Sequence, residues 1–399
     1  MKNKKYFPSA FILYLTYFVH GIGCSVLGQS VIKESLASQW AYSDLAAGIG
    51  AVTMVSAALG LGRLISLPIS GPLSDKFGRK PAILIGIVAY AIFFLGIAYS
   101  PNMSVAYGAA IMGGIANSFL DTGVIPACVE ILEPKSSLAT MGTKFFISMA
   151  QLLLPFMLGI IASNQMNYNV LLIVTGIAIL IIAVLVIFSP LPKEEKAVQT
   201  EKQPSLLQNI KNTKFTMESV ALIVIGFTCT ATFQLWLNCA QTFAKDLAGM
   251  ANPSIMQTYY STGSLVAIVV TAFLVNKIKG VRFLFIYPLV TLITLLVVIF
   301  MPSETTCLIG SALVGFSAGA VILQLVTATA NDLFPHIKGT ITSIVMIMSS
   351  LSNYTILTLA GTMDSSSIMW MNIGITTVGV LLALFVNVRY ARLDASAQR

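Results

Sequence analysis

The chain has 399 residues, of which 56% are apolar and only 10% are charged, with a mean hydropathy of +0.86 and a net charge of +8. Soluble globular domains are typically about a quarter charged, so this composition excludes a soluble protein and indicates one solvated mainly by lipid. The basic excess is spread over short loops, which argues against a nucleic-acid partner. The 5 cysteines lie apart, with neither disulfide nor metal-site spacing.

Twelve apolar segments follow one another along the chain, each long enough for a helix to cross a hydrocarbon core of about 30 Å. They lie near residues 8–31, 46–70, 81–100, 104–129, 139–163, 168–189, 217–243, 255–276, 282–301, 306–331, 339–361 and 367–388. The first is too long for a signal peptide and is predicted to be a span. The expected fold class is an all-α polytopic membrane protein with twelve transmembrane helices.

The positions of the 23 Lys and Arg residues predict the orientation, because cationic loops stay on the cytoplasmic side of a membrane. With the N-terminus inside, all of them are cytoplasmic except Lys33, Arg63, Lys144 and Lys245. Lys33 and Lys245 are expected at the outer ends of spans, and the other two inside spans. We therefore expect a multi-pass protein of the cell inner (plasma) membrane with both termini in the cytoplasm.

An internal repeat divides the twelve segments into six and six. LSDKFGRKPAILI from Leu73 aligns with LVNKIKGVRFLFI from Leu274, and VEILEP from Val129 aligns with ANDLFP from Ala330, both at an offset of 201 residues. The longest polar stretch, 191–215, lies between the halves as a linker. The sequence thus predicts two pseudo-symmetric six-helix bundles, at 1–190 and 216–399, that flank a central cavity and rock against each other.

The sequence GPLSDKFGRK at 71–80 fills the pattern G-x-L-[SA]-D-[RK]-x-G-[RK]-[RK] at every position. This is the signature loop of the major facilitator superfamily, which the chain resembles, and the resemblance implies the fold of that family and transport by alternating access. Gly71 is expected to allow close helix contact and Gly78 a tight turn. Asp75 is expected to latch the inner side shut against a helix N-terminus of the second bundle.

The basic residues of this gating loop have their own expected roles. Arg79 is predicted to pair with Glu130, and Lys80 completes the loop. In the second copy Asn276 replaces the aspartate, so only the first copy is expected to act as a latch. The alternative is a solvated turn whose charges serve only to orient the chain.

Three longer stretches carry a narrower resemblance. YFPSAFILYLTYFVHGIG, GLGRLISLPISGPLSDKFGRKP and GIANSFLDTGVIPACVEILEP are similar to the YdiM/YdiN type of enterobacterial inner-membrane transport proteins. The resemblance implies a small-metabolite substrate such as quinate or shikimate. Drug antiporters of the superfamily carry G-x-x-x-G-P-x-x-G-G in helix 5, whereas Leu154 precedes Pro155 here. This departure disfavours multidrug export.

Ionisable residues inside a span cost at least about 2.5 kcal/mol each, so they are candidates for function. The chain has four: His20, Arg63, Asp121 and Lys144. The last three lie about 6 to 8 residues from the inner boundaries of their spans, which places them at one level. We expect that they can meet there, with His20 nearer the midplane.

The charged groups have alternative interpretations. Asp121 and His20 are the candidates for proton coupling, Asp121 by alternate pairing with Arg63 or Lys144; alternatively Asp121 forms a permanent salt bridge. Lys144 either faces the substrate or extends to the inner surface. His20 is a substrate donor, a proton relay or a bundle histidine with satisfied hydrogen bonds. Since two cations accompany one acid, a substrate carboxylate would complete the set.

Neutral polar residues recur at helical spacing in both halves, where they suit the hydroxyl groups of a substrate or, alternatively, bridge helices. The predicted substrate-binding residues are His20, Arg63, Asn117, Lys144, Gln151, Gln234, Asn238, Gln241, Gln324, Asn353 and Tyr354.

These observations predict a proton-coupled symporter of a hydroxylated carboxylate, driven by the proton gradient because the sequence has no P-loop. The alternatives are a proton-coupled antiporter that exports drugs or metabolites, a sugar/proton symporter, and a sensing or lipid-flipping membrane protein. The expected partners are a small-molecule substrate, protons and the lipid bilayer. We expect a monomer with no enzymatic activity, no cofactor and no metal.

Overall fold

The computed structural model describes residues 4–133, 136–192, 215–275, 277–319, 321–334 and 337–397, and these ranges contain helices and no strand. The α-helices are α1 (Phe7–Ser25), α2 (Ser30–Gln39), α3 (Leu45–Phe77), α4 (Arg79–Ala98), α5 (Met103–Leu132), α6 (Ser136–Ser163), α7 (Asn169–Phe188), α9 (Met217–Ala248), α10 (Met256–Leu274), α11 (Gly280–Phe300), α12 (Glu304–Val314), α13 (Ile322–Leu333), α14 (Lys338–Ala360) and α15 (Ser365–Ala397). The shorter turns are η1 (Lys4–Tyr6), η2 (Val26–Gly28), η3 (Pro253–Ile255) and η4 (Gly315–Gly319).

In the part of the chain that the structure describes, helices occupy every predicted apolar segment, which confirms the all-α polytopic fold. Within the described residues, 11 helical stretches are long and apolar enough to cross a membrane. The remaining predicted segment, 255–276, contains α10, a helix of 19 residues whose first half carries Gln257, Thr258 and Ser261. These polar residues lower its hydropathy, yet α10 packs against α6 and α12.

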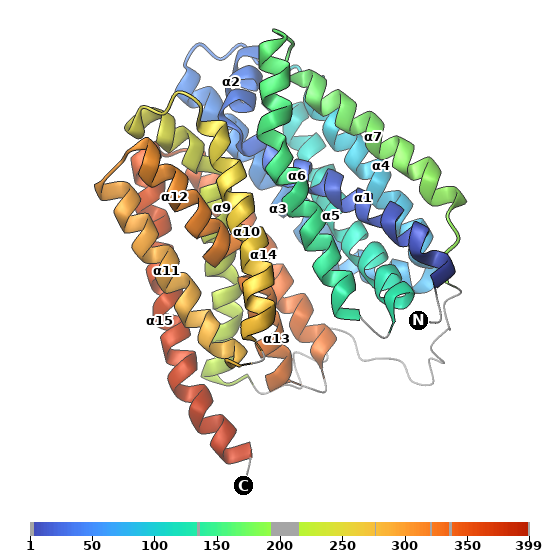
Figure 1. Cartoon of the computed structure of the whole chain (residues 1–399). Helices are drawn as coiled ribbons and strands as arrows, with labels where there is room; N and C mark the ends of the chain where they lie inside the picture. Colours follow the sequence, from blue (N-terminus) through green and yellow to red (C-terminus); the bar gives the residue numbers. More distant parts are fainter. Residues whose placement is uncertain are drawn as a thin grey trace.

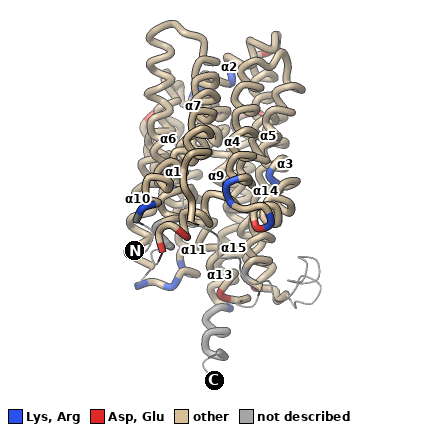
Figure 2. Tube along the Cα trace, turned by 90° about the vertical axis from the view of Figure 1, so that its right-hand side faces the viewer, with Lys and Arg blue, Asp and Glu red and all other residues tan. Residues whose placement is uncertain are grey.

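Figure 1 shows the helices in two groups, with α4 to α7 on the right and α11, α12 and α15 on the left. We call the end at which α2 lies the upper end, and the end at which α1 begins the lower end. Figure 2 shows long tan stretches along the helices, with the charged residues mainly toward the lower end. Charge is thus concentrated outside the apolar stretches, as lipid solvation requires.

Each group buries an apolar core of its own. The core of α1 to α7 includes Tyr90, Phe93 and Phe94, which are fully buried. In α9 to α15 a lower cluster forms around Leu284 and a separate upper cluster around Trp236. A fourth, smaller cluster contains residues of both groups and joins them.

Two predicted helices are interrupted. The segment at 8–31 ends as α1 at Ser25, because Gln29 takes an extended conformation before α2 begins. The segment at 306–331 is broken by the π turn η4, where Gly315 and Gly319 pack closely against Tyr260 of α10. Breaks of this kind depend on a neighbouring helix and leave no mark in hydropathy.

The two groups meet toward the upper end. Gly60 of α3 packs against the backbone of Tyr354 in α14, where an added Cβ would lie 2.6 Å from the amide nitrogen. Ala57 joins Cys239 and Leu357 in the apolar cluster between the groups. About one turn lower, Arg63 Nη2 still lies 3.7 Å from Met346 Sδ of α14. Farther down α3, Ile69 is 51% exposed and an added Cβ at Gly71 would meet no atom within 4 Å, so this part of α3 lacks such close contacts.

Candidate functional site

A partly buried ion pair joins α3 to α5 in the first group. Arg63 Nη2 lies 2.8 Å from Asp121 Oδ2, and the Tyr17 hydroxyl of α1 donates to Asp121 Oδ1 at 2.7 Å. The pair can form because Gly62 and Gly114 allow the two helices to approach closely. The side chains of Arg63 and Asp121 are 23% and 26% exposed, so water reaches the pair.

Cationic donors remain unused beside this pair. Arg63 Nε is buried without a hydrogen-bond partner. Lys144 of α6 is half-buried and lies within electrostatic range of both Arg63 and Asp121. Among the described residues, no hydrogen bond or ion pair to Lys144 Nζ is present. The three residues predicted to meet thus form one contact pair with a second cation nearby, and carry a net positive charge.

His20 belongs to a neighbouring hydrogen-bonded chain. Its Nδ1 lies 2.6 Å from the Tyr90 hydroxyl, which also donates to Asn117 Oδ1. Its Nε2 lies 3.3 Å from the thiol sulfur of Cys24. His20 reaches the ion pair only indirectly, through Tyr17, whose ring centroid is 5.5 Å from the imidazole centroid. Tyr17 therefore lies between His20 and Asp121, and Tyr90 connects His20 to Asn117; the sequence interpretation missed both tyrosines.

The remaining predicted residue of the first group bridges helices. Gln151 of α6 is buried and donates to Ser25 Oγ of α1 at 2.7 Å. Asn117 is likewise engaged, by Tyr90. The sequence offered helix bridging as an alternative for such amides, and in this conformation both have structural partners.

The predicted polar residues of the second group do not gather in one place. Gln234 Oε1 accepts from Asn238 Nδ2 at 3.1 Å on α9. Gln241 Nε2 donates to Gln29 Oε1 of the first group at 3.0 Å, which places Gln241 in the upper contact between the groups. Gln324 is half-buried on α13.

Two predicted residues on α14 lie closer to the ion pair. Asn353 and Tyr354 pack against Gly60, which is about one turn of α3 above Arg63. Asn353 Oδ1 is buried without a hydrogen-bond partner, so it is available to a hydroxyl donor. The site that the structure assembles therefore comprises Arg63, Asp121 and Lys144, with these α14 residues on its upper side.

Lys33 was expected at an outer end. It lies on α2 at the upper end, but its side chain is only 1% exposed. Its Nζ donates to Thr53 Oγ1 at 2.7 Å and to the carbonyl oxygen of Asn238 at 2.5 Å. Because α2 folds inward after the break at Gln29, the ammonium enters the contact between the two groups. Lys245, in contrast, is half-exposed and pairs with Glu34 at 2.5 Å.

In the gating loop, the polar residues bond within the first group. Arg79 Nη1 lies 2.7 Å from Asp75 Oδ1, and Arg79 Nε lies 3.7 Å from Glu130 Oε1, the pair that the sequence suggested. Gly78 has φ of 97°, a conformation that favours glycine at this turn. Lys80 donates to the carbonyl oxygens of Ile187 and Ser189 at 3.0 and 2.8 Å and so holds the end of α7.

Two expectations for this loop are not met in this conformation. An added Cβ at Gly71 would meet no atom within 4 Å, so no close helix contact exists there. The Asp75 side chain is 63% exposed and pairs with Arg79 rather than with a helix of the second group. Both residues lie on the lower part of α3, which lacks such close contacts. Asn276, in the second copy of the loop, lies outside the described residues.

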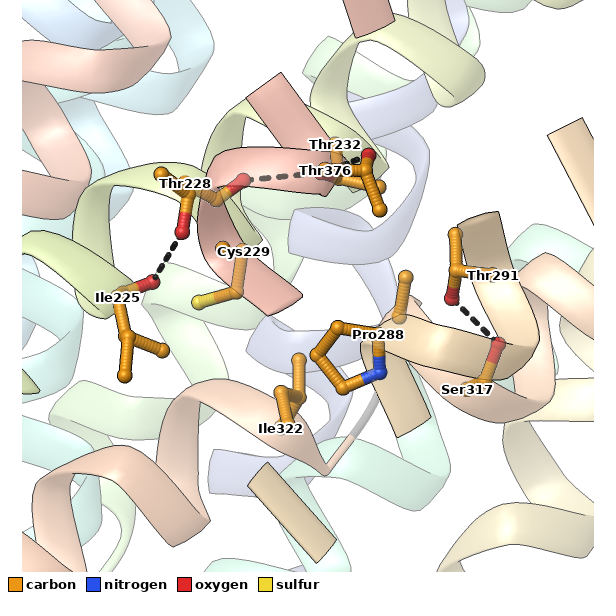
Figure 3. Close-up of a pocket in the computed structure, with 11 residues that line it drawn as sticks. Ile225, Thr228, Cys229, Thr232, Pro288, Thr291, Ser317, Ile322 and Thr376 are labelled. Carbon is orange, nitrogen blue, oxygen red and sulfur yellow. Dashed lines mark hydrogen bonds between the residues drawn. The ribbon is translucent and has the colours of Figure 1, made fainter. Parts of the chain in front are cut away.

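A separate pocket lies inside the second group, between α9, α11, η4, α13 and α15 (Figure 3). Its polar atoms bond one another: Thr232 to Thr376 at 2.8 Å and Thr291 to Ser317 at 2.6 Å. None of the predicted site residues lines it. It therefore offers fewer free donors than the region around Arg63.

Comparison with known proteins identifies the class of protein. The family model of the Major Facilitator Superfamily matches residues 13–356, so the chain belongs to this family of membrane transporters. The chain is 32% identical over 404 residues to the inner membrane transport protein YdiN of Escherichia coli (strain K12), covering 98% of this chain and 94% of YdiN. The YdiM/YdiN-type resemblance is thereby confirmed.

Two further proteins are similar to this chain, one over nearly its whole length and one over about a quarter of it. A crystal structure of a D-xylose-proton symporter superposes with a TM-score of 0.75 at 20% identity, covering 95% of this chain and 97% of that one, and shows the same fold. The 4-hydroxybenzoate transporter PcaK of Acinetobacter baylyi (strain ATCC 33305 / BD413 / ADP1) is 35% identical over 94 residues, which is 24% of this chain and 19% of PcaK.

Proposed function

We propose that the protein is a proton-coupled symporter that imports a small hydroxylated carboxylate, similar to shikimate or quinate. The observation that carries the proposal is the charge around Asp121: two cations face one carboxylate, and both Arg63 Nε and Lys144 Nζ lack partners among the described residues. An anionic substrate supplies the missing charge, and a carboxylate suits the planar guanidinium.

Proton coupling follows from competition for Arg63. While Asp121 is ionised, it occupies one edge of the guanidinium. Protonation of Asp121 weakens that attraction and frees Arg63 for the substrate carboxylate, so proton and anion bind together. Tyr17 and the His20–Tyr90–Asn117 chain give the proton a hydrogen-bonded neighbourhood beside Asp121.

The movement that we propose is rocking of 1–190 against 216–399. With the lower end in the cytoplasm, both termini are cytoplasmic and the present conformation is open to the inside. The linker at 191–215 would tether the halves, although 193–214 lie outside the described residues. In the opposite conformation, the lower end closes and Asp75 is positioned to meet the second half.

The substrate class rests on the polar groups above the ion pair. Asn353 Oδ1 is free to accept from a hydroxyl, and Asn117 and Gln151 carry amides on the first-group side. PcaK, by its name, transports a hydroxylated carboxylate, and its partial similarity supports the same chemical class for this chain. An exporter of cationic drugs would gain nothing from two cations beside its substrate.

The proposal is tested by uptake into proteoliposomes with an imposed proton gradient. Shikimate and quinate are compared with neutral sugars and with a cationic dye in the same vesicles. We expect accumulation of a carboxylate that collapses when a protonophore dissipates the gradient. Transport of a sugar alone would favour the sugar symporter, and proton-dependent extrusion of the dye alone would favour the drug antiporter; either result overturns the proposal.

A further inference from the structure

The upper contact between the groups contains a buried cation without a counterion. Lys33 is almost fully buried, and its ammonium bonds only neutral oxygens, those of Thr53 and of the Asn238 backbone. Glu34, its neighbour in sequence, pairs instead with Lys245. Burying an ammonium without an acid costs several kcal/mol, so this arrangement is not explained by stability alone.

A second donor near this lysine is also bonded to a neutral oxygen of the opposite group. The backbone amide of Ser30 donates to Gln241 Oε1 at 3.0 Å. Ser30 and Lys33 belong to α2, whereas both acceptor oxygens belong to α9 of the opposite group. Lys33 and Ser30 thus each donate across the contact to a neutral oxygen of α9. Thr53 is a second acceptor for Lys33 within the first group, and Gln241 Nε2 donates back to Gln29 Oε1.

Opening of the upper end separates these partners. When α9 withdraws from α2, Lys33 Nζ and the Ser30 amide lose one acceptor each and face external water. A carboxylate carries two oxygens and accepts charge-assisted hydrogen bonds that are about twice as strong as neutral ones. Thr53 keeps the ammonium in place from the first group, because it lies on α3.

We propose that Lys33, Ser30 and Thr53 form an external binding site for the substrate carboxylate, covered by Asn238 and Gln241 in this conformation and exposed when the upper end opens. The site rests on the proposed function and adds an entry position to it. Arg63 follows Thr53 by ten residues of one helix, about 15 Å farther down. A carboxylate captured at Lys33 passes from there to Arg63 and Lys144.

A simple latch role for Lys33 makes the opposite prediction. If its bond to Asn238 only held the upper end shut, removing it would favour the outward-open state, and the KM for external substrate would fall or stay unchanged. If Lys33 binds substrate, removing it raises that KM. The sign of the change therefore separates the two roles.

The test compares Lys33→Met with Lys33→Arg and with Lys245→Met in right-side-out vesicles, using shikimate as the probe. We expect Lys33→Met to raise the external KM about tenfold or more, because a charge-assisted hydrogen bond is lost. Lys33→Arg should retain most of the affinity. Lys245→Met should stay within about twofold, because that residue is half-exposed at the rim and paired with Glu34.

Cys239 provides a second readout that needs no transport. It is buried between the groups beside Ala57 and Leu357, so a membrane-impermeant maleimide reaches it only after the upper end opens. External shikimate should slow its labelling in the wild type, as mapped by mass spectrometry of peptides, and should not do so in Lys33→Met. The uncharged methyl ester of shikimate should have no effect in either protein.

The possible failures are distinct. An unchanged or lowered external KM in Lys33→Met, with equal protection of Cys239 in both proteins, overturns the external site and leaves the proposed function standing. Absence of any carboxylate uptake by the wild type overturns both. If Lys33→Met does not fold, Lys33→Gln and the protection of wild-type Cys239 by shikimate but not by its ester decide the question.

Discussion

Two buried cations of this transporter have opposite surroundings. Arg63 faces a carboxylate within its own group and stays partly hydrated, whereas Lys33 is almost completely buried against neutral oxygens, one of them on the other group. An ion pair within one group persists when the groups move, but a bond between groups must break in each cycle. The contrast indicates that Arg63 belongs to a site retained in both conformations. Lys33 belongs to a site that is exposed in only one of the two conformations.

The largest effect is expected from removal of the acid of the retained site. We expect Asp121→Asn to abolish proton-driven accumulation, lowering it about 100-fold or more, because the carboxamide carries no proton between conformations. Substrate counterflow without a gradient should persist, since Arg63 and Lys144 remain. Accumulation at the wild-type level would show that another group couples the proton.

Removal of the guanidinium should have the next largest effect. Arg63→Gln leaves Asp121 with Tyr17 alone and should destabilise the protein by about 1–3 kcal/mol, a value reduced from that of a fully buried pair because water reaches this one. The thermal unfolding midpoint in detergent measures this loss. The double variant Arg63→Gln/Asp121→Asn should recover stability but not transport, and failure to recover would show that the pair is not the cause.

Lys144→Gln tests the second cation of the retained site. Since Lys144 has no bonded partner among the described residues, its removal should leave stability within about 0.5 kcal/mol. The KM for shikimate should rise about tenfold through loss of attraction to the carboxylate. An unchanged KM would assign Lys144 to the membrane surface, the alternative that its sequence position also allowed.

The smallest effect is expected in the gating loop. Asp75 is exposed here and pairs only with Arg79, so Asp75→Asn should not disturb this conformation. If Asp75 closes the lower end in the opposite conformation, the variant should slow transport severalfold without changing the KM for shikimate, and it should reduce external labelling of Cys239. Equal transport rates in the variant and the wild type would show that the charges of the loop serve only to orient the chain in the membrane.

The glycine contacts explain why the retained site is well formed. Gly62 and Gly114 bring α3 and α5 together around Arg63, and an added Cβ at Gly114 would lie 2.6 Å from the Arg63 backbone nitrogen. The sequence placed Arg63 and Asp121 at one depth by counting residues along their helices. It could not show that these helices face each other, because facing depends on helix rotation and close packing.

The amino-acid sequence was enough to predict the twelve helical segments, the all-α membrane fold and the residues of the gating loop. These properties depend on local composition: a run of about 20 apolar residues must form a helix in lipid, whatever its neighbours are. The intramembrane charges were equally visible, since an ionisable residue in such a run is expensive and few are present.

The tertiary structure alone decided which of these residues touch. The sequence placed Lys33 at the outer end of a span, but the chain break at Gln29 turns its side chain inward to Asn238. It also placed Gln241 in a substrate cavity, whereas Gln241 covers the Ser30 amide between the groups. The physical reason is that partners across two bundles depend on helix rotation and on the conformation of the transporter, neither of which is encoded in any single segment.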